Sequence, residues 1–500
     1  MKVFASLACL GALALIAHAA EPSALWGDSG ESWDPAGRLP DFSFAGYRFG
    51  EKELPEVEAV ADVTDFGAVG DGATDCTAAF RRAIEETDCG AITIPEGRFL
   101  IRDILWIRKP GIVLRGAGAG RTVLFIDRKL EDLRPNMGQT TGGRPTSNYS
   151  WSGGFLWVKG RIADPRLATI ESEARRGERV VEVDDAAALE PGMRVTVRQE
   201  DDAGGSLLSH LYSDEPGDVS KITRPVRPEM LARIESIKGR RVTLDRPLRI
   251  DVRTSWSPAL HAFEPSVEEV GIENLAIEFP PEPYEGHFTE RGMNGIAMNG
   301  VADCWVRNVR ISNSDSGVYL TGVCCTMKGV VLDSKREPKH GDTGHHGITV
   351  GKDCLVENFI FETSFIHDVT VSNLGAGNVI KNGRGPDLSF DHHKRAPHDN
   401  LFCRIDVGAG KSVWRCGGGN SLGRHSGART TFWALESKRP IDWPPADFGP
   451  DSMNLVGVRG KGKGTTDPDG RWHEKIEPSL LAPSDLHAAQ LARRLGDRAP

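Results

Sequence analysis

The stretch ADVTDFGAVGDGATDCTAAFRRAIEETDCGAITIPEGRFLI, residues 61–101, decides the fold of this chain. Residues 63–66 predict a short strand, and the glycines after them predict tight turns. Thr74 or Asp75 is placed to cap a helix, because both residue types accept hydrogen bonds from the free N–H groups of a first helical turn. The apolar stripe of that helix consists of Ala79, Phe80, Ala83 and Ile84. Apolar runs at 91–94, 99–101, 112–114 and 123–126 predict four short strands.

A repeat begins near residue 267. Its segments are VGIENLAI from Val270, DCWVRNVRI from Asp303, CCTMKGVVL from Cys324, DCLVENFIF from Asp353, GNVIKNGRG from Gly377 and DNLFCRIDV from Asp399. One aligned position falls at 274, 308, 329, 358, 382 and 404, so the steps are 34, 21, 29, 24 and 22 residues. Periods in the twenties are typical of a solenoid, in which one coil holds three short strands.

Two residue types recur at fixed positions of these coils. Four of the aligned positions are asparagine, namely Asn274, Asn308, Asn358 and Asn382. Stacked asparagine amides can hydrogen-bond to each other at a bend, so we predict a structural ladder. Cys304, Cys325, Cys354 and Cys403 occupy strand positions and are predicted to be small buried residues. Cys76 and Cys89 flank the first helix, and in an exported protein they could pair as a disulfide.

The segment DFGAVGDGATD, with AFRRAIEE and ITIPEGRFLI after it, resembles the N-terminal signature of the pectate-lyase-like superfamily. The resemblance implies an all-β fold, a right-handed parallel β-helix whose open end is covered by the N-terminal helix. Elementary physics favours the same arrangement, because an uncovered first coil would expose unpaired backbone groups and an apolar core to water. The signature implies the fold and does not identify a reaction.

The chain divides around this solenoid. The predicted parts are residues 1–20 as a signal peptide, 21–60 as an N-terminal extension, 61–147 as the cap and first coils, 148–264 as a small inserted antiparallel β subdomain, 265–436 as the main coils with the candidate site, and 437–500 as an irregular tail with a terminal helix. The insert is predicted because residues 179–197 and 232–250 alternate apolar and polar side chains. Residues 201–230 within it predict a polar surface loop, and Ser484 or Asp485 is placed to cap the last helix.

The first residues, MKVFASLACLGALALIAHAA, predict export to the periplasm or the cell exterior. Lys2 precedes an apolar run, and small residues at 19–20 suit cleavage. No later stretch is apolar enough to span a membrane. The formal net charge of −9 argues against nucleic acid as a partner. It allows an anionic polysaccharide or oligosaccharide, which needs only a locally basic groove.

Histidine is concentrated between residues 339 and 429, which hold eight of the 14 histidines. The runs HGDTGHHGITVG from His340 and SFDHHKRAPHDN from Ser389 stand out. The second run combines an aspartate, histidines and cations, and such a set can neutralise a sugar carboxylate and remove a neighbouring proton. The predicted catalytic residues are His392, His393, Lys394, Arg395, Asp391, His346 and His367. The predicted substrate-binding residues are His345, Asp342, His398, Arg424, His425 and Arg429.

These residues favour a polysaccharide lyase that cleaves a uronate-containing glycan by β-elimination. A hydrolase is the first alternative, because Asn313-Ser314-Asp315 and Gly344-His345-His346-Gly347 resemble parts of the polygalacturonase motif set. The paired aspartates and Arg-x-Lys of that set are missing here. Hydrolysis needs two carboxyl groups at the groove, and the candidates are Asp315, Asp342, Asp368 and Asp391. A non-catalytic carbohydrate-binding solenoid is the second alternative.

The residues themselves assign no metal site. The two histidine runs contain ordinary metal ligands, yet acid–base work or direct sugar contact is the favoured interpretation. The resemblance to calcium pectate lyases implies Ca²⁺ as a candidate cofactor. The aspartate ligands and the arginine base of those enzymes do not match this chain residue by residue.

Overall fold

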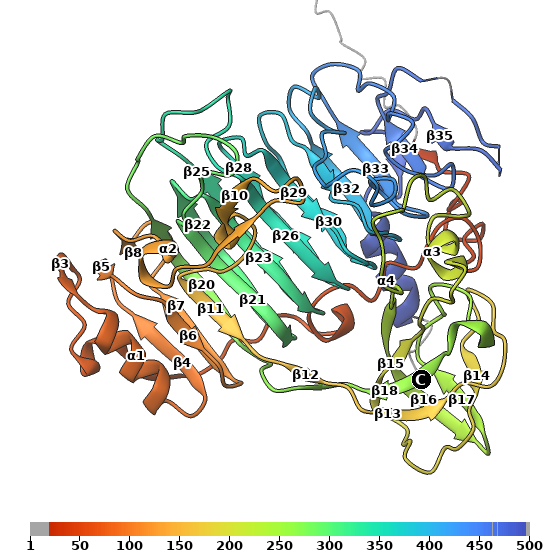
Figure 1. The fold of residues 1–500 in the computed structure, drawn as a ribbon, viewed down its shortest axis with the longest axis horizontal. Helices are drawn as coiled ribbons and strands as arrows, with labels where there is room; N and C mark the ends of the chain where they lie inside the picture. The colour runs from red at the N-terminus through yellow and green to blue at the C-terminus, as the bar shows by residue number, and fades with distance from the viewer. Residues whose placement is uncertain (1–19, 463, 468, 497–500) are drawn as a thin grey trace, which may run out of the picture.

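The computed structural model describes residues 20–462, 464–467 and 469–496. It shows a right-handed parallel β-helix with a smaller sheet packed on its side, which confirms the predicted fold (Figure 1). The predicted signal peptide lies, apart from residue 20, outside the described residues. Within the described part, no helix is long and apolar enough to cross a membrane.

One wall of the solenoid is a seven-stranded sheet in which every neighbouring pair is parallel. Its strands, in spatial order, are β31 (Phe390–His392), β29 (His367–Val371), β26 (His346–Lys352), β23 (Ser316–Val323), β21 (Asn294–Ala302), β11 (Leu156–Lys159) and β6 (Leu105–Ile107). Strand β11 falls inside the range 148–264 that we assigned to the inserted subdomain, but it pairs with β6 and β21 of the solenoid.

The other two walls form one hydrogen-bonded network. One wall contains β2 (Ala59–Asp62), β4 (Gly90–Ile94), β7 (Ile112–Gly116), β20 (Gly271–Glu278), β22 (Trp305–Ser312), β24 (Thr326–Lys328), β27 (Leu355–Glu357), β30 (Val379–Lys381), β32 (Leu401–Asp406), β33 (Thr431–Glu436), β34 (Asn454–Val458) and β35 (Trp472–Glu474). The other contains β3 (Asp71–Asp75), β5 (Gly97–Ile101), β8 (Thr122–Ile126), β25 (Val331–Asp333) and β28 (Ile360–Phe361), with the second halves of β20 and β22. Strands β34 and β35 extend the solenoid past residue 436, so the segment from 437 is not irregular throughout.

The corner between these two walls carries the predicted asparagine ladder. Asn274, Asn308, Asn358 and Asn382 have φ angles of 58°, 53°, 56° and 54°. This left-handed conformation turns the strand, and asparagine tolerates it better than most residues. The amide of Asn308 donates to Oδ1 of Asn274 at 3.1 Å. The shared left-handed conformation therefore explains the repeat, whereas among the described residues the predicted amide–amide hydrogen bond joins only Asn274 and Asn308 of this row.

Of the two predictions for the cysteines, the structure confirms burial and contradicts the disulfide. Cys304, Cys325 and Cys354 lie in the solenoid core, and Cys403 is buried in a second apolar cluster, as expected. The predicted disulfide between Cys76 and Cys89 is wrong, because both thiols are free. Helix α1 (Thr77–Glu86) separates them, and ten helical residues span about 15 Å. Disulfides join Cα atoms that are at most about 7 Å apart.

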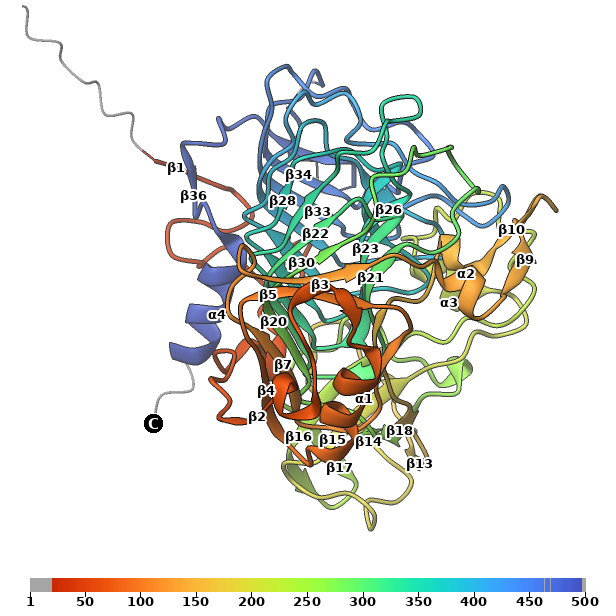
Figure 2. The same cartoon turned by 90° about the vertical axis from the view of Figure 1, so that its left-hand side faces the viewer.

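Helix α1 covers the first coil, as the resemblance implied (Figure 2). Its predicted apolar stripe is buried, and Oδ1 of Asp75 accepts a hydrogen bond from the backbone N–H of Thr77 at 2.9 Å. The predicted strand at residues 63–66 is wrong, because these residues form the 3-10 helix η2 (Val63–Phe66). The carboxylate of Asp62 accepts from the N–H of Thr64, and Gly67, with φ 91°, ends the turn.

The inserted subdomain is a six-stranded antiparallel sheet. Its strands, in spatial order, are β13 (Arg166–Thr169), β18 (Ala259–Ala262), β15 (Arg194–Arg198), β16 (Glu229–Lys238), β17 (Arg241–Leu244) and β14 (Val180–Glu182). It joins the solenoid through buried ion pairs of Arg246 and Arg249 with Asp353. The predicted surface loop at 201–230 instead contains α3 (Ser206–His210), and the Tyr212 hydroxyl after it accepts from the N–H of Ala396 at 2.8 Å.

The C-terminal helix α4 (Leu486–Gly496) packs on the side of the solenoid (Figure 2). Oδ1 of Asp485 accepts from the N–H of Ala488 at 3.0 Å, which confirms Asp485 as a capping residue. The buried Gln490 bonds the N-terminal extension through Phe42 and Pro40. The short remaining elements are β1 (Glu21–Pro22), η1 (Tyr47–Gly50), α2 (Leu130–Leu133), β9 (Met137–Gln139), β10 (Pro145–Ser147), η3 (Asn148–Ser150), β12 (Ile162–Ala163), η4 (Thr254–Trp256), β19 (Glu264–Pro265) and β36 (Leu481–Ala482).

Candidate active-site groove

A groove of about 550 Å³ lies over the outer face of the seven-stranded sheet. The residues that line it are Gln139, Thr140, Thr141, Gly142, Trp151, His287, Phe288, Tyr319, His345, His346, Thr349, His367, Thr370, Ser372, His393 and Gly417 to Gly419. The hairpin of β9 and β10 and the loop at 417–419 meet above it: a Cβ atom on Gly419 would lie 3.0 Å from Cγ2 of Thr141. The groove is therefore partly roofed.

Stacked strands bring outward-facing residues from successive coils into one row. Tyr319, Thr349, Thr370 and Asp391 are in register across β23, β26, β29 and β31. His346 and His367 are also in register. His346 faces the groove because Gly347 takes the inward position, where a Cβ atom would lie 2.3 Å from the core ring of Phe361.

Five imidazoles form a histidine cluster, which we define as His287, His345, His346, His367 and His393. The ring centroids of His345 lie 4.2 Å from His346, 4.5 Å from His287 and 5.4 Å from His367. Those of His367 lie 4.9 Å from His346 and 5.3 Å from His393. Residues from three coils and one loop therefore meet within a single site.

Two buried carboxylates stand behind the histidine cluster. Oδ2 of Asp391 lies 2.8 Å from Nδ1 of His393 and 3.3 Å from Nδ1 of His367. Oδ1 of Asp391 accepts a hydrogen bond from the N–H of Gly417 at 2.7 Å. Oε1 of Glu290 lies 3.6 Å from Nδ1 of His345 and accepts from the hydroxyl of Tyr284. Both carboxylates are covered by other side chains and do not line the groove.

Burial and these contacts separate the protonation states of the cluster. Burial lowers the pKa values of His345 and His346 well below the ordinary range, and those of His287 and His367 to about 4. Burial acts against the charged form of His393 too, but Asp391 outweighs it and raises the pKa of His393. At neutral pH four imidazoles are therefore uncharged, and one is held next to a carboxylate.

The two carboxylates also differ in their protonation states. Burial would raise the pKa of Asp391, but His367 and His393 hold that pKa well below its usual range. Burial raises the pKa of Glu290 to about 7. Asp391 is therefore ionised at neutral pH, whereas Glu290 is partly protonated.

The structure brings together five of the predicted site residues, namely Asp391, His393, His345, His346 and His367. Lys394 lies at the rim, where a Cβ atom on Gly418 would be 3.1 Å from its Cγ atom. Arg395 is exposed on the same turn and does not line the groove.

Other predicted site residues lie elsewhere. His392 points into the core against Phe402 and Phe448, so its predicted catalytic position is not in the groove. His398 is buried at the junction with the subdomain, and Arg429 pairs with Asp399 at 2.7 Å.

The remaining three predicted binding residues also have local partners. Arg424 bonds Glu215 at 3.1 Å, and Nδ1 of His425 lies 3.1 Å from the carbonyl oxygen of His392. Asp342 lies 3.4 Å from the guanidinium of Arg415. None of the three lines the groove.

The carboxylates proposed for hydrolysis are mostly structural. Asp315 pairs with Arg336 at 2.9 Å and accepts three backbone N–H groups. Asp368 accepts from Phe365 and Ser389, and burial raises its pKa to about 6. Of the four candidates, only Asp391 contacts the histidine cluster.

Sequence reasoning missed the groove residues that lie outside the two histidine runs. His287 and Phe288 come from the loop between β20 and β21, which also carries the buried Glu290, and Trp151 follows η3. The motif EGHFTE at residues 285–290 contains a histidine between acidic residues, and this was the available signal. The place of His287 in the groove depends on the path of this loop, and no sequence period predicts that path.

The cluster does not fit the calcium ion that the resemblance implied. Ca²⁺ takes six to eight oxygen ligands, whereas this site offers mainly imidazole nitrogens. The residues of the cluster therefore do not form a calcium site.

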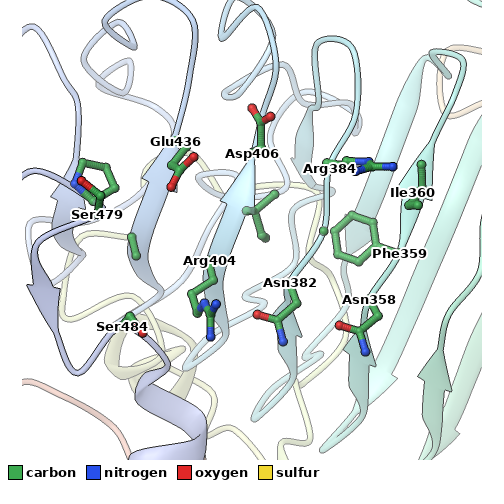
Figure 3. A pocket seen from close by; sticks show the side chains of 14 residues that line it. Asn358, Phe359, Ile360, Asn382, Arg384, Arg404, Asp406, Glu436, Ser479 and Ser484 are labelled. Atoms are coloured by element: carbon green, nitrogen blue, oxygen red, sulfur yellow. The ribbon is translucent and has the colours of Figure 1, made fainter.

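A second depression, of about 710 Å³, lies along the asparagine corner (Figure 3). Asn358, Asn382 and Arg404 form a row there, with Arg384, Asp406 and Glu436 beside it. Its 14 lining residues, all within the described part of the chain, include no histidine. The histidine groove is therefore the stronger candidate for proton transfer near neutral pH.

Comparisons with known proteins match the N-terminal part by sequence. Residues 60–143 match the family model described as "Rhamnogalacturonase A/epimerase, pectate lyase-like". Mannuronan C5-epimerase AlgE1 of Azotobacter vinelandii is 31% identical over 103 residues, which are 19% of this chain and 7% of that protein. The chain thus matches only a small part of the curated relatives' length.

Solved structures give a similar result over more of the chain. The tailspike protein gp49 from Pseudomonas phage LKA1 has a TM-score of 0.42 and 14% identity, and the match covers 77% of this chain and 64% of the tailspike. The A-module of mannuronan C-5 epimerase AlgE6 from Azotobacter vinelandii has a TM-score of 0.36 and 11% identity, with 79% and 80% covered. The family-model match alone confirms the resemblance of residues 60–143 to the pectate-lyase-like superfamily.

Proposed function

We propose that this protein is an exported enzyme that cleaves a uronate-containing polysaccharide by β-elimination in the histidine groove. The observation that carries the proposal is the pair of Asp391 and His393: a buried, ionised carboxylate lies 2.8 Å from an imidazole that opens onto the groove. A carboxylate in this position orients the imidazole and makes it a stronger base. Export rests on the predicted signal peptide.

The reaction assigns one role to each group. Neutral His393 removes the proton on the sugar carbon next to the uronate carboxylate. The electron pair of that C–H bond forms a double bond to the next ring carbon, and the bond from this carbon to the glycosidic oxygen breaks. The leaving oxygen takes a proton from solvent water, because the hydroxyl of Tyr319 is buried and donates to Ser316 at 2.9 Å. Asp391 positions His393 and does not touch the substrate.

Basic side chains at the rim suit an anionic substrate. Lys394 follows His393, and the guanidinium of Arg144 lies 5.5 Å from the ring centre of Phe288, which lines the groove. A cation close to the uronate carboxylate would stabilise the negative charge that develops when the neighbouring proton leaves. The epimerases that match the N-terminal part are named for mannuronan, a uronate polymer, which agrees with this substrate class.

Hydrolysis is a second candidate, favoured by one observation. The pKa of Glu290 is raised and that of Asp391 is lowered, and such a separation is usual for the acid and the base of glycosidases. Both carboxylates are buried behind imidazoles, so a sugar would reach them only after side chains move. Elimination by the exposed edge of His393 needs no such movement.

Incubation of the purified protein with a panel of uronate polymers tests the proposal. Elimination gives the ultraviolet band of an unsaturated uronate, whereas hydrolysis releases reducing ends without that band. We expect the band with at least one polymer, a loss of at least about 100-fold in kcat for His393→Ala, and no loss for the exposed His340→Ala. Reducing ends without the band would support the hydrolase, and full activity of His393→Ala would refute the assigned base.

A further inference from the structure

Three members of the histidine cluster have no role in the proposed proton transfer. His287 comes from the loop before β21, His345 directly precedes β26, and His367 begins β29. Each offers one ring nitrogen, and these three nitrogens lie within 4.8 Å of one another. A tetrahedral ion with Zn–N bonds of about 2.1 Å holds its ligand nitrogens about 3.4 Å apart. Small side-chain rotations close the remaining difference.

Buried ring nitrogens of this set lack hydrogen bonds. His367 is 3% exposed, and within the described part of the chain its Nε2 atom has no hydrogen-bond partner, whereas its Nδ1 atom faces the carboxylate of Asp391 at 3.3 Å. His345 is 2% exposed, and its Nδ1 atom also has no hydrogen-bond partner among the described residues. Burying a polar atom without a partner is costly, so such atoms are rare in native proteins. A bound ion would satisfy both imidazoles at once.

Carboxylates stand beside the two buried imidazoles. Oδ2 of Asp391 lies 3.3 Å from Nδ1 of His367, and Oε1 of Glu290 lies 3.6 Å from Nδ1 of His345. In metal sites such a carboxylate bonds the ring nitrogen that does not bind the ion, so Nε2 is the nitrogen of His367 that remains for the ion. Oε2 of Glu290 is also buried without a hydrogen-bond partner among the described residues.

We propose that His287, His345 and His367 bind a divalent transition-metal ion of the Zn²⁺ type. Imidazole nitrogen suits Zn²⁺, Co²⁺, Ni²⁺ and Cu²⁺, and three histidines leave a fourth position facing the groove. The proposal goes beyond the proposed β-elimination and does not depend on it, because His393 is not among the three ligands. One ligand nitrogen, from His287, lies on the loop between β20 and β21, so the ion would link this loop to the strands β26 and β29.

The test uses the tag-free protein, stripped with a chelator and then titrated with Co²⁺. We expect one equivalent of Co²⁺ to produce the visible absorption bands of a tetrahedral nitrogen site, and Zn²⁺ to displace it. His287→Ala and His367→Ala should each weaken binding at least about tenfold and abolish the bands. His340→Ala is the matched control, because it removes an exposed histidine outside the cluster and should bind like the parent.

His287 is half-buried on a loop, so its variant is expected to fold, and circular dichroism checks this point. Absence of the bands with the parent protein would overturn the proposal, as would unchanged binding by both His287→Ala and His367→Ala. Equal weakening by His340→Ala would also overturn it. No glycan is present in this titration, so failure of the proposed lyase activity leaves the result unaffected, and an active enzyme that binds no Co²⁺ refutes only the metal site.

Discussion

The adjacent histidines at 392 and 393 should change the stability of the protein with pH in opposite directions. His392 is fully buried among Phe402, Phe432 and Phe448, and burial lowers its pKa to about 4. An unfolded histidine has a pKa of about 6.5, so the unfolded state binds more protons between these values. The contribution of His392 is therefore complete above pH 6.5 and declines as the pH falls towards 4.

The magnitude follows from the two pKa values. The difference between about 6.5 in the unfolded state and a pKa of about 4 in the folded state corresponds to about 3 kcal/mol in the free energy of unfolding, of which about 2 kcal/mol is lost between pH 7 and pH 4.5. Asparagine at this position does not titrate and keeps a donor for the carbonyl oxygen of Phe390, which lies 3.0 Å from Nδ1 of His392. Between pH 7 and pH 4.5, the free energy of unfolding of His392→Asn should therefore fall by about 2 kcal/mol less than that of the parent. Any pH-independent effect of the substitution cancels in this comparison.

Urea unfolding of the chelator-treated protein at the two pH values measures this difference, because the other buried histidines contribute equally to both proteins. His393→Asn is the control with the opposite sign. The pKa of His393 is raised by Asp391, so its contribution is present at low pH and is lost as the pH rises through the folded value. Equal pH dependence of the parent and His392→Asn would refute the assignment of His392 to the core.

Four further changes test other parts of the structure. Asp391→Asn removes the charge that raises the pKa of His393, so it should lower kcat and move the acidic limb of the pH–rate profile to lower pH; an unmoved limb would contradict the pairing. Asn308→Ala places alanine at φ 53° and should cost about 1–2 kcal/mol in urea unfolding, more than Asn308→Gly. Asp399→Asn leaves the buried Arg429 without its charged partner and should cost about 3–5 kcal/mol, so a loss below about 1 kcal/mol would be inconsistent with the ion pair. A thiol reagent should modify the exposed Cys89 in the native protein and Cys76 only after unfolding, and a Cys76–Cys89 disulfide found by mass spectrometry would contradict the free thiols.

The fold was predictable because its signals are local and repeated. The turn at Asn274 recurs at Asn308, Asn358 and Asn382, and each asparagine adopts the same left-handed conformation. Such a position can be recognised in a single sequence because several coils have the same residue at the same backbone turn. The strand predicted at residues 63–66 failed because Asp62 and Gly67 set a local turn that overrode the β-branched residues.

The candidate site was predictable only in part, because it depends on which face of a strand each residue occupies. In the run SFDHHKR, Phe390 is a core residue, and alternation places His392 on the same side. The signal that assigns His392 to the core was therefore present in the sequence. His287 had no such signal, because loop residues follow no period and their position depends on tertiary contacts.

Strand register also explains why the site has its position. Each coil adds one outward residue to the row of Tyr319, Thr349, Thr370 and Asp391, and the row ends in a carboxylate. His367 and His393 flank that carboxylate from two neighbouring coils, so their spacing is set by the distance between strands of about 4.8 Å and not by flexible loops. Within the histidine cluster, His287 lies on the long loop between β20 and β21. A change in loop position therefore affects the three-histidine metal set and leaves the Asp391–His393 pair in place, which makes metal affinity and proton transfer separable properties of one groove.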